Sequence, residues 1–217
     1  MNMNNVLLQN IQGSRYFKKD LYSLKTVDQV IDEIYYKVNH VCPWEKNTRN
    51  QQVKGMNAGV RGISQGGLAS SGFCLLWKLF TLKPSKHDLE KILYHRDSVY
   101  IRVIGLLFVR LCVKPADYLE WILDCLTDDT DIPNIKPAHQ GNPRDNITLG
   151  AYTQDLFSSN LKYYDTIMPR IPVTILKDIK SAVEDEQDAD EKYGGDWGEL
   201  IEEDRERERS PHRNNRY

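Results

Sequence analysis

The chain has 217 residues, a formal net charge of −2 at pH 7 and 40% hydrophobic residues, which predicts one domain with a real core. Residues 1–10 lack a basic region followed by a long apolar run, and no stretch reaches the roughly 18 apolar residues that cross a bilayer. We therefore expect neither secretion nor membrane insertion. The four cysteines show no CxxC spacing, which predicts small buried thiols in a reducing compartment.

The first helices predicted along the chain are marked by caps and apolar spacing. Residues Thr26–Gln29 form a capping-box pattern, and apolar residues then recur at helical spacing to about Asn39. A second helix is predicted over residues 68–81, where apolar side chains are dense enough that we expect the central helix of the fold. Ser85, three residues before Asp88, predicts the start of a short third helix.

The rest of the body is also predicted to be helical. Residues 98–113 are apolar nearly all round, which indicates a helix surrounded by others. Pro115 suits the first turn of a further helix reaching residue 126, and Thr148 and Pro172 mark two more helix starts. Residues 128–146 are rich in Pro, Gly, Asn and Asp, which predicts a loop with room for a short hairpin.

The predicted fold is therefore all-α: a single compact multi-helix domain over residues 1–182, with a glycine-rich loop before its central helix. Residues 183–217 have few aliphatic side chains and dense charge, so we expect a disordered tail, acidic first and then rich in Arg and Glu. In this tail Trp197 begins a short apolar island that suits a partner groove. Ser210, in a Ser-Pro pair, is a candidate phosphorylation site.

Charge is distributed unevenly along the chain. Residues 1–114 hold 17 basic and 8 acidic residues, whereas residues 115–183 hold 6 basic and 10 acidic ones. Residues 184–217 hold 13 acidic and 6 basic residues. A basic lobe, an acidic lobe and an acidic tail suit a protein that sits among nucleic acid and charged partner segments, and a solvated mixed surface would show the same counts.

The glycine-rich loop raises the question of a phosphate site. Five glycines lie between residues 55 and 67, before a predicted helix whose backbone amides could hold an anion. No Gly-Lys-Ser/Thr follows and no apolar strand precedes them, which argues against nucleotide binding. Because glycine permits positive φ and close backbone approach, the loop either packs tightly on a neighbouring helix or accepts a partner's chain.

Enzymatic patterns are equally weak. The five histidines are scattered and show no spacing typical of metal ligands. Residues Gly62–Gly66 have the Gly-x-Ser-x-Gly pattern of a nucleophile elbow, but no predicted strand leads into it, as an elbow requires. We therefore predict no catalytic, cofactor-binding or metal-binding residues, and no small-molecule substrate.

Six segments carry a resemblance to a known family. They occur in one order along residues 30–173 and include two uncommon ones, Pro-Trp-Glu-Lys and Tyr-Ile-Arg-Val-Ile-Gly. The six are VIDEIYYKV (Val30–Val38), HVCPWEK (His40–Lys46), GVRGISQGG (Gly59–Gly67), FCLLWKLFTLK (Phe73–Lys83), YIRVIGLLFVRL (Tyr100–Leu111) and MPRIPV (Met168–Val173). In these segments the chain resembles the helical domain of the pre-mRNA-splicing factor 38 family. Its residues there are closer to those of the B-type branch than to those of the A-type branch.

The resemblance implies a nuclear, non-enzymatic spliceosome subunit. Such a subunit would act as a protein–protein interaction scaffold at the tri-snRNP or precatalytic stage, with other spliceosomal proteins as partners. The alternative is a sequence-independent RNA-binding protein that uses the basic lobe, with weak contact to small nuclear RNA or pre-mRNA; Arg15–Lys19 is the one cluster that mixes aromatic and basic residues. The candidate partner-binding residues are Trp44, Arg61, Gly62, Gly66, Gly67, Tyr100, Arg102, Arg110 and Trp197.

Arg102 and Arg110 lie eight residues apart in otherwise apolar helical sequence, so they share approximately one helix face. A buried guanidinium must be paired and hydrogen-bonded. Internal carboxylates such as Glu33 or Asp97, helix-end carbonyls, or an acidic segment of a partner could each satisfy it.

Because the sequence holds no phosphate cradle or ligand cluster, the purified protein should bind neither ATP nor a divalent metal ion more tightly than about millimolar. Calorimetric titration of each ligand measures this. Micromolar binding of either one would contradict the non-enzymatic interpretation.

Overall fold

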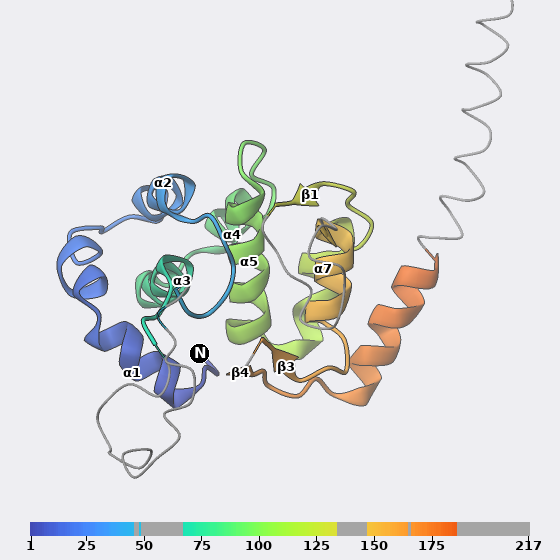
Figure 1. Ribbon diagram of the computed structural model, residues 1–217. Coiled ribbons are helices and arrows are strands. Elements are labelled where there is room, and N and C mark those ends of the chain that lie inside the picture. Colours follow the sequence, from blue (N-terminus) through green and yellow to red (C-terminus); the bar gives the residue numbers. More distant parts are fainter. Residues whose placement is uncertain (46–47, 49–66, 134–146, 165, 186–217) are drawn as a thin grey trace, which may run out of the picture.

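The computed structural model describes residues 1–45, 48, 67–133, 147–164 and 166–185, and these are mostly helical (Figure 1). A last helix covers residues 173–185. In chain order the other helices are α1 (Asn5–Gly13), η1 (Tyr16–Asp20), α2 (Val27–Lys37), α3 (Ser71–Leu82), α4 (Lys86–Leu93), α5 (Val99–Cys112), η2 (Pro115–Asp117), α6 (Tyr118–Ile122), η3 (Leu123–Cys125) and α7 (Leu149–Leu156). The prediction of an all-α fold is confirmed.

Two very short antiparallel strand pairs accompany the helices. Strand β1 (Asp131–Ile132) pairs with β2 (Ile147–Thr148), and β3 (Lys162–Tyr163) pairs with β4 (Thr166–Ile167). The first pair brings together the two ends of the predicted loop. The second pair was not predicted, because two residues per strand give no detectable alternation of apolar and polar side chains.

Helix caps are the features that the sequence predicts best. Thr26 Oγ1 accepts a hydrogen bond from the Gln29 amide, and Gln29 Oε1 accepts one from the Thr26 amide, which completes the predicted capping box of α2. Ser85 and Asp88 form the same reciprocal pair at α4. Thr148 Oγ1 caps α7 by accepting from the amide of Ala151.

Helix α3 begins at Ser71, three residues later than predicted. The side chain of Ser70 is the cap, because its Oγ accepts a hydrogen bond from the Phe73 amide at 3.3 Å. Leu68 and Ala69 are extended instead, because their backbone pairs with a segment that follows α2. This long-range pairing is what the local pattern of apolar residues could not reveal.

The centre of the fold is α5, and not α3 as predicted. Between Ile101 and Leu111 every α5 residue is buried except Arg102, which is half-buried. Helix α5 packs against α2, α3, α4, α6, α7 and β1, and Figure 1 shows it between the α1–α3 side and the α7 side. The prediction of a helix surrounded by others is therefore confirmed for residues 98–113. Helix α3 is also largely buried, between α1, η1, α2 and α5.

Other predicted elements differ in detail. The helix expected from Pro115 to residue 126 is divided into η2, α6 and η3. Helix α1 was not predicted; Asn4 caps it and it buries Leu7 and Ile11, four residues apart. The helix expected at Pro172 is present, with Leu176 donating its amide to the Pro172 carbonyl. Among the described helices, none is long and apolar enough to cross a membrane.

The predicted boundary between domain and tail falls inside a helix. Residues 173–185 are continuously helical, so the helix passes through residue 183. The boundary itself stays a prediction. The tail from residue 186 onward, with Trp197 and Ser210, lies outside the described residues.

The close approach of α4 to α5 depends on Gly105. A Cβ atom at this position would lie 2.8 Å from Ile92 Cγ2 and 3.0 Å from Leu93 Cδ2, both in α4. A larger residue therefore forces the side chains of Ile92 and Leu93, or the helix that carries them, to shift, because core packing leaves no spare volume.

We predict that Gly105→Ala lowers the free energy of unfolding by about 1–3 kcal/mol through overpacking. Urea denaturation followed by circular dichroism measures the change. Gly13→Ala is the matched control, because a Cβ there meets no atom within 4 Å and α1 gains a better helix former. Equal stability of the Gly105→Ala variant and the wild type would contradict this account of the α4–α5 contact.

Candidate functional site

The glycine-rich segment is closed at its base by backbone pairing between its two ends. The Glu45 amide donates to the Leu68 carbonyl at 2.8 Å, and the Ser70 amide donates to the Pro43 carbonyl at 2.9 Å. Between them Trp44 and Ala69 form an antiparallel bridge. The described residues on its two sides, 43–45 and 68–70, therefore lie next to each other directly before α3.

Glu45 fastens this base to α3. Its Oε1 accepts a hydrogen bond from the amide of Ser71, the first residue of α3, at 3.0 Å. A carboxylate at a helix N-terminus is favourable, because it satisfies a free amide and faces the positive end of the helix dipole. The Glu45 carbonyl also accepts from Thr48 Oγ1, which in turn accepts from the Leu68 amide.

The residues before Glu45 are tied to the core. His40 is 3% exposed; its Nδ1 lies 2.7 Å from Asn39 Oδ1, and its Nε2 lies 3.9 Å from Glu45 Oε2. Tyr163 of β3 donates its hydroxyl to the Val41 carbonyl at 2.8 Å. Burial raises the pKa of Tyr163 well above its ordinary value, so this hydroxyl keeps its proton. The base is thus held by hydrogen bonds among three distant parts of the chain.

Two of the predicted partner-binding residues lie at this base. Trp44 is half-buried, and Gly67 is buried with φ of 81°, a left-handed conformation that a side chain strains. Leu68, which the sequence did not single out, is 61% exposed beside them. Arg61, Gly62 and Gly66 lie outside the described residues. We call Trp44, Gly67 and Leu68 the loop-base surface.

Arg102 and Arg110 have internal partners. Arg102 Nε donates to the Leu93 carbonyl at 3.0 Å, and its Nη2 donates to Asp128. Arg110 is 1% exposed; its Nε donates to the Leu156 carbonyl at 3.1 Å and its Nη2 to the Pro169 carbonyl. Leu93 is the last residue of α4 and Leu156 the last residue of α7.

Each arginine of α5 therefore caps the C-terminal end of a neighbouring helix, where carbonyls lack partners and the dipole is negative. Three kinds of partner were possible for these arginines from the sequence, and both arginines bind carbonyls at helix ends. The carboxylate beside Arg102 is Asp128, and neither Glu33 nor Asp97 pairs with either arginine; Glu33 accepts from the Tyr16 hydroxyl at 2.9 Å. Tyr100 is half-buried and donates its hydroxyl to the Pro133 carbonyl.

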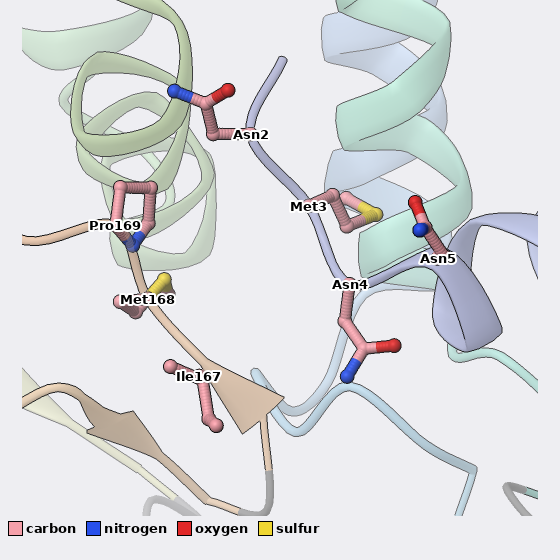
Figure 2. A pocket seen from close by; sticks show the side chains of 7 residues that line it. All are labelled: Asn2, Met3, Asn4, Asn5, Ile167, Met168 and Pro169. Carbon is pink, nitrogen blue, oxygen red and sulfur yellow. The ribbon is translucent and has the colours of Figure 1, made fainter.

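A groove of about 520 Å³ lies between the N-terminal segment and β4 (Figure 2). It is lined by Asn2, Met3, Asn4, Asn5, Ile167, Met168 and Pro169. Arg110 holds the Pro169 carbonyl from inside, and the Asn2 amide donates to the Leu111 carbonyl, so both walls are attached to the end of α5. The Met168–Val173 motif supplies two of the residues that line this groove, Met168 and Pro169, so the sequence contained one indication of it.

We next consider metal-binding groups and reactive cysteines among the described residues. They contain no group of three or more His, Cys, Asp or Glu side chains placed to hold a metal ion. The four cysteines are free; Cys74 and Cys125 are buried, and Cys42 and Cys112 are half-buried. Burial raises the pKa of Cys74 to about 11 and that of Cys112 to about 12, so both thiols stay protonated and unreactive at neutral pH.

The site residues described above belong to a helical domain in which charged side chains such as Arg102, Arg110 and Glu45 hold the helices together. The PRP38 family model matches residues 1–181, and the chain belongs to this family. It is 40% identical over 211 residues to pre-mRNA-splicing factor 38B of Mus musculus, 40% identical over 202 residues to that of Homo sapiens, and 36% identical over 195 residues to pre-mRNA splicing factor SR-like 1 of Arabidopsis thaliana. These matches cover 97%, 93% and 90% of this chain.

The predicted family and its B-type branch are confirmed by these similarities. The chain spans only 38%, 36% and 43% of the length of these three relatives. The fold is also similar to a chain in the crystal structure of the Snu23–Prp38–MFAP1(217–258) complex of Chaetomium thermophilum. The TM-score is 0.59 with 18% sequence identity, over 82% of this chain and 81% of the other, so this likeness concerns the fold.

The Arg102–Asp128 pair makes stability depend on pH. Partial burial acts to raise the pKa of Asp128, but hydrogen bonds from Thr130 and Arg102 outweigh it, so the pKa lies below its ordinary value. A carboxyl whose pKa is lowered by folding stabilises the fold above its unfolded pKa of about 3.9. That contribution is lost as the pH falls through the folded pKa.

We predict that Asp128→Asn lowers the free energy of unfolding by about 1–3 kcal/mol at pH 7, because it leaves Arg102 without its charged partner. The difference from the wild type should shrink as the pH falls below about 4. Denaturant titrations at a series of pH values measure it. Asp129→Asn, at an exposed neighbouring carboxylate, is the control, and a pH-independent difference for Asp128→Asn would contradict the assignment.

Proposed function

We propose that this protein is a non-catalytic subunit of the pre-mRNA splicing machinery in the nucleus. The observation that carries the proposal is the 40% identity to pre-mRNA-splicing factor 38B over almost the whole chain. Membership of the PRP38 family across residues 1–181 supports it further. The stage at which it acts, in this proposal, is the tri-snRNP or the precatalytic spliceosome before activation.

Its role in the proposal is that of a protein–protein interaction scaffold. A rigid helical core suits this role, since partners can be placed accurately only by surfaces that do not rearrange. The structurally similar chain comes from a complex of three proteins, and a related domain seated among partners is what a scaffold requires. Among the described residues, no group of three or more His, Cys, Asp or Glu side chains is placed to hold a metal ion.

The loop-base surface is the partner contact we propose first. A half-buried tryptophan beside an exposed leucine on rigid backbone has the composition of an interface hot spot. Arg61, Gly62 and Gly66 adjoin it in sequence, and they stay candidates together with Tyr100 and Trp197. We leave Arg102 and Arg110 out of this surface, because the hydrogen bonds that the structure gives them are internal.

Affinity purification of the tagged full-length protein from nuclear extract, followed by mass spectrometry, tests the function. We expect splicing proteins to be enriched over an unrelated tagged control. Recovery of a metabolic or membrane complex without splicing proteins would overturn the proposal.

The same purification tests the surface. Leu68→Asp should reduce recovery of the partner at least about tenfold while leaving the melting temperature unchanged, because Leu68 is exposed and packs on no core. Val173→Asp, at a position 68% exposed in the last helix, is the matched control and should bind normally. Gly67→Val should lower the melting temperature as well, because of the strained φ. Unchanged partners for a folded Leu68→Asp variant would refute the loop-base surface.

A further inference from the structure

Strand β4 has a free edge, at which backbone groups point away from β3. In an antiparallel pair of strands, hydrogen-bonded and non-hydrogen-bonded residue pairs alternate. The Met168 amide donates to the Leu161 carbonyl at 2.7 Å, so the next pair, Lys162 with Ile167, is a non-hydrogen-bonded one. The amide and the carbonyl of Ile167 therefore point outward. The Lys162 amide also points away from its partner strand, as this alternation requires, and donates to Asn160 Oδ1.

The opposite wall of the groove in Figure 2 also has unpaired backbone groups. This wall consists of the residues before α1, and the Asn2 amide fixes it to α5 by donating to the Leu111 carbonyl at 3.2 Å. Met3 makes no backbone hydrogen bond to another described residue, and no backbone hydrogen bond joins described residues 1–5 to β4. Unpaired amides and carbonyls thus lie on both sides of the groove.

The groove itself is uncharged. Its lining side chains are three asparagines, two methionines, an isoleucine and a proline. The carboxamides can donate and accept hydrogen bonds, whereas a charged group that entered the groove would leave water without meeting an opposite charge among the lining residues. The volume of about 520 Å³ is within the range of about 300–1,000 Å³ for binding clefts. The groove therefore favours an uncharged occupant that both donates and accepts hydrogen bonds.

The side chains along β4 indicate what such an occupant should carry. Thr166 and Met168 are buried, whereas Ile167 is 70% exposed. A strand added beside β4 would place one side chain next to Ile167 on the exposed face, where a β-branched or aromatic residue packs well. Its neighbouring side chains would point to the inner face, toward a small cavity that shares lining residues with the groove and is also lined by Leu7 and Phe73.

We propose that this groove binds an extended, uncharged segment of a partner protein, which adds a strand to the free edge of β4. The amide and the carbonyl of Ile167 each make one hydrogen bond with the added strand, and the Met3 backbone and the asparagine carboxamides bind it from the other side. The pairing is short, because Pro169 has no amide to donate at the next outward position. A second copy of the chain is the less suitable occupant, since a folded domain enters a groove between two walls less readily than a single strand. The groove contains none of the loop-base residues and does not depend on the scaffold function.

A proline at position 167 tests the backbone contact directly. Ile167→Pro removes the outward amide but no hydrogen bond between β3 and β4, so the strand pair should remain, and Ile167→Val keeps the amide as the matched control. A phage-displayed library of random nonapeptides is depleted on the Ile167→Pro protein and then selected on the full-length wild type, tagged at its C-terminus. We expect the enriched peptides to be uncharged, with β-branched or aromatic residues at alternate positions.

The most enriched peptide, labelled with fluorescein, should bind the wild type and Ile167→Val alike and Ile167→Pro at least about tenfold more weakly, because a carbonyl of the peptide loses its donor. Hydrogen exchange followed by NMR on the wild type gives a reading that holds even if the proline variant is unstable. The Ile167 amide should exchange at least about tenfold more slowly with the peptide bound than without it.

Three results would each overturn this site: no enrichment in the selection, equal binding of the enriched peptide to all three proteins, or an Ile167 amide that the bound peptide does not protect. Sedimentation velocity tests the other occupant. A dimer of the wild type that Ile167→Pro abolishes would assign the edge of β4 to a second copy of the chain instead of a partner's segment.

Discussion

The fold depends on a buried helix that carries two arginines. Helix α5 is surrounded on nearly all sides, and Arg102 and Arg110 reach from it to the last carbonyls of α4 and α7. Each guanidinium offsets part of the cost of its own burial, because it satisfies a carbonyl at a helix end and faces the negative end of that helix dipole. Nη1 of Arg110 is buried without a hydrogen-bond partner, so the offset there is incomplete. The neighbouring helices are thereby fixed in length and in position relative to α5.

A charged side chain also caps the start of α3, and there the charge is negative because a helix N-terminus is positive. There the carboxylate of Glu45 accepts a hydrogen bond from the first amide of the helix, while the backbone of Glu45 pairs with Leu68. Charged side chains in this domain thus act mainly at helix ends. Because these groups are occupied within the fold, exposed residues such as Leu68 remain for contacts with other molecules. The loop-base surface offers apolar area on rigid backbone, which favours a folded or extended protein partner.

The sequence by itself determined the helical class, the family and the caps of α2, α4 and α7, because caps and helical spacing are set by residues three or four positions apart. Only the tertiary structure decided which helix is central, where α3 begins, and what Arg102 and Arg110 bind. Those outcomes depend on contacts between distant residues, such as Glu45 with Leu68 and Arg110 with Leu156.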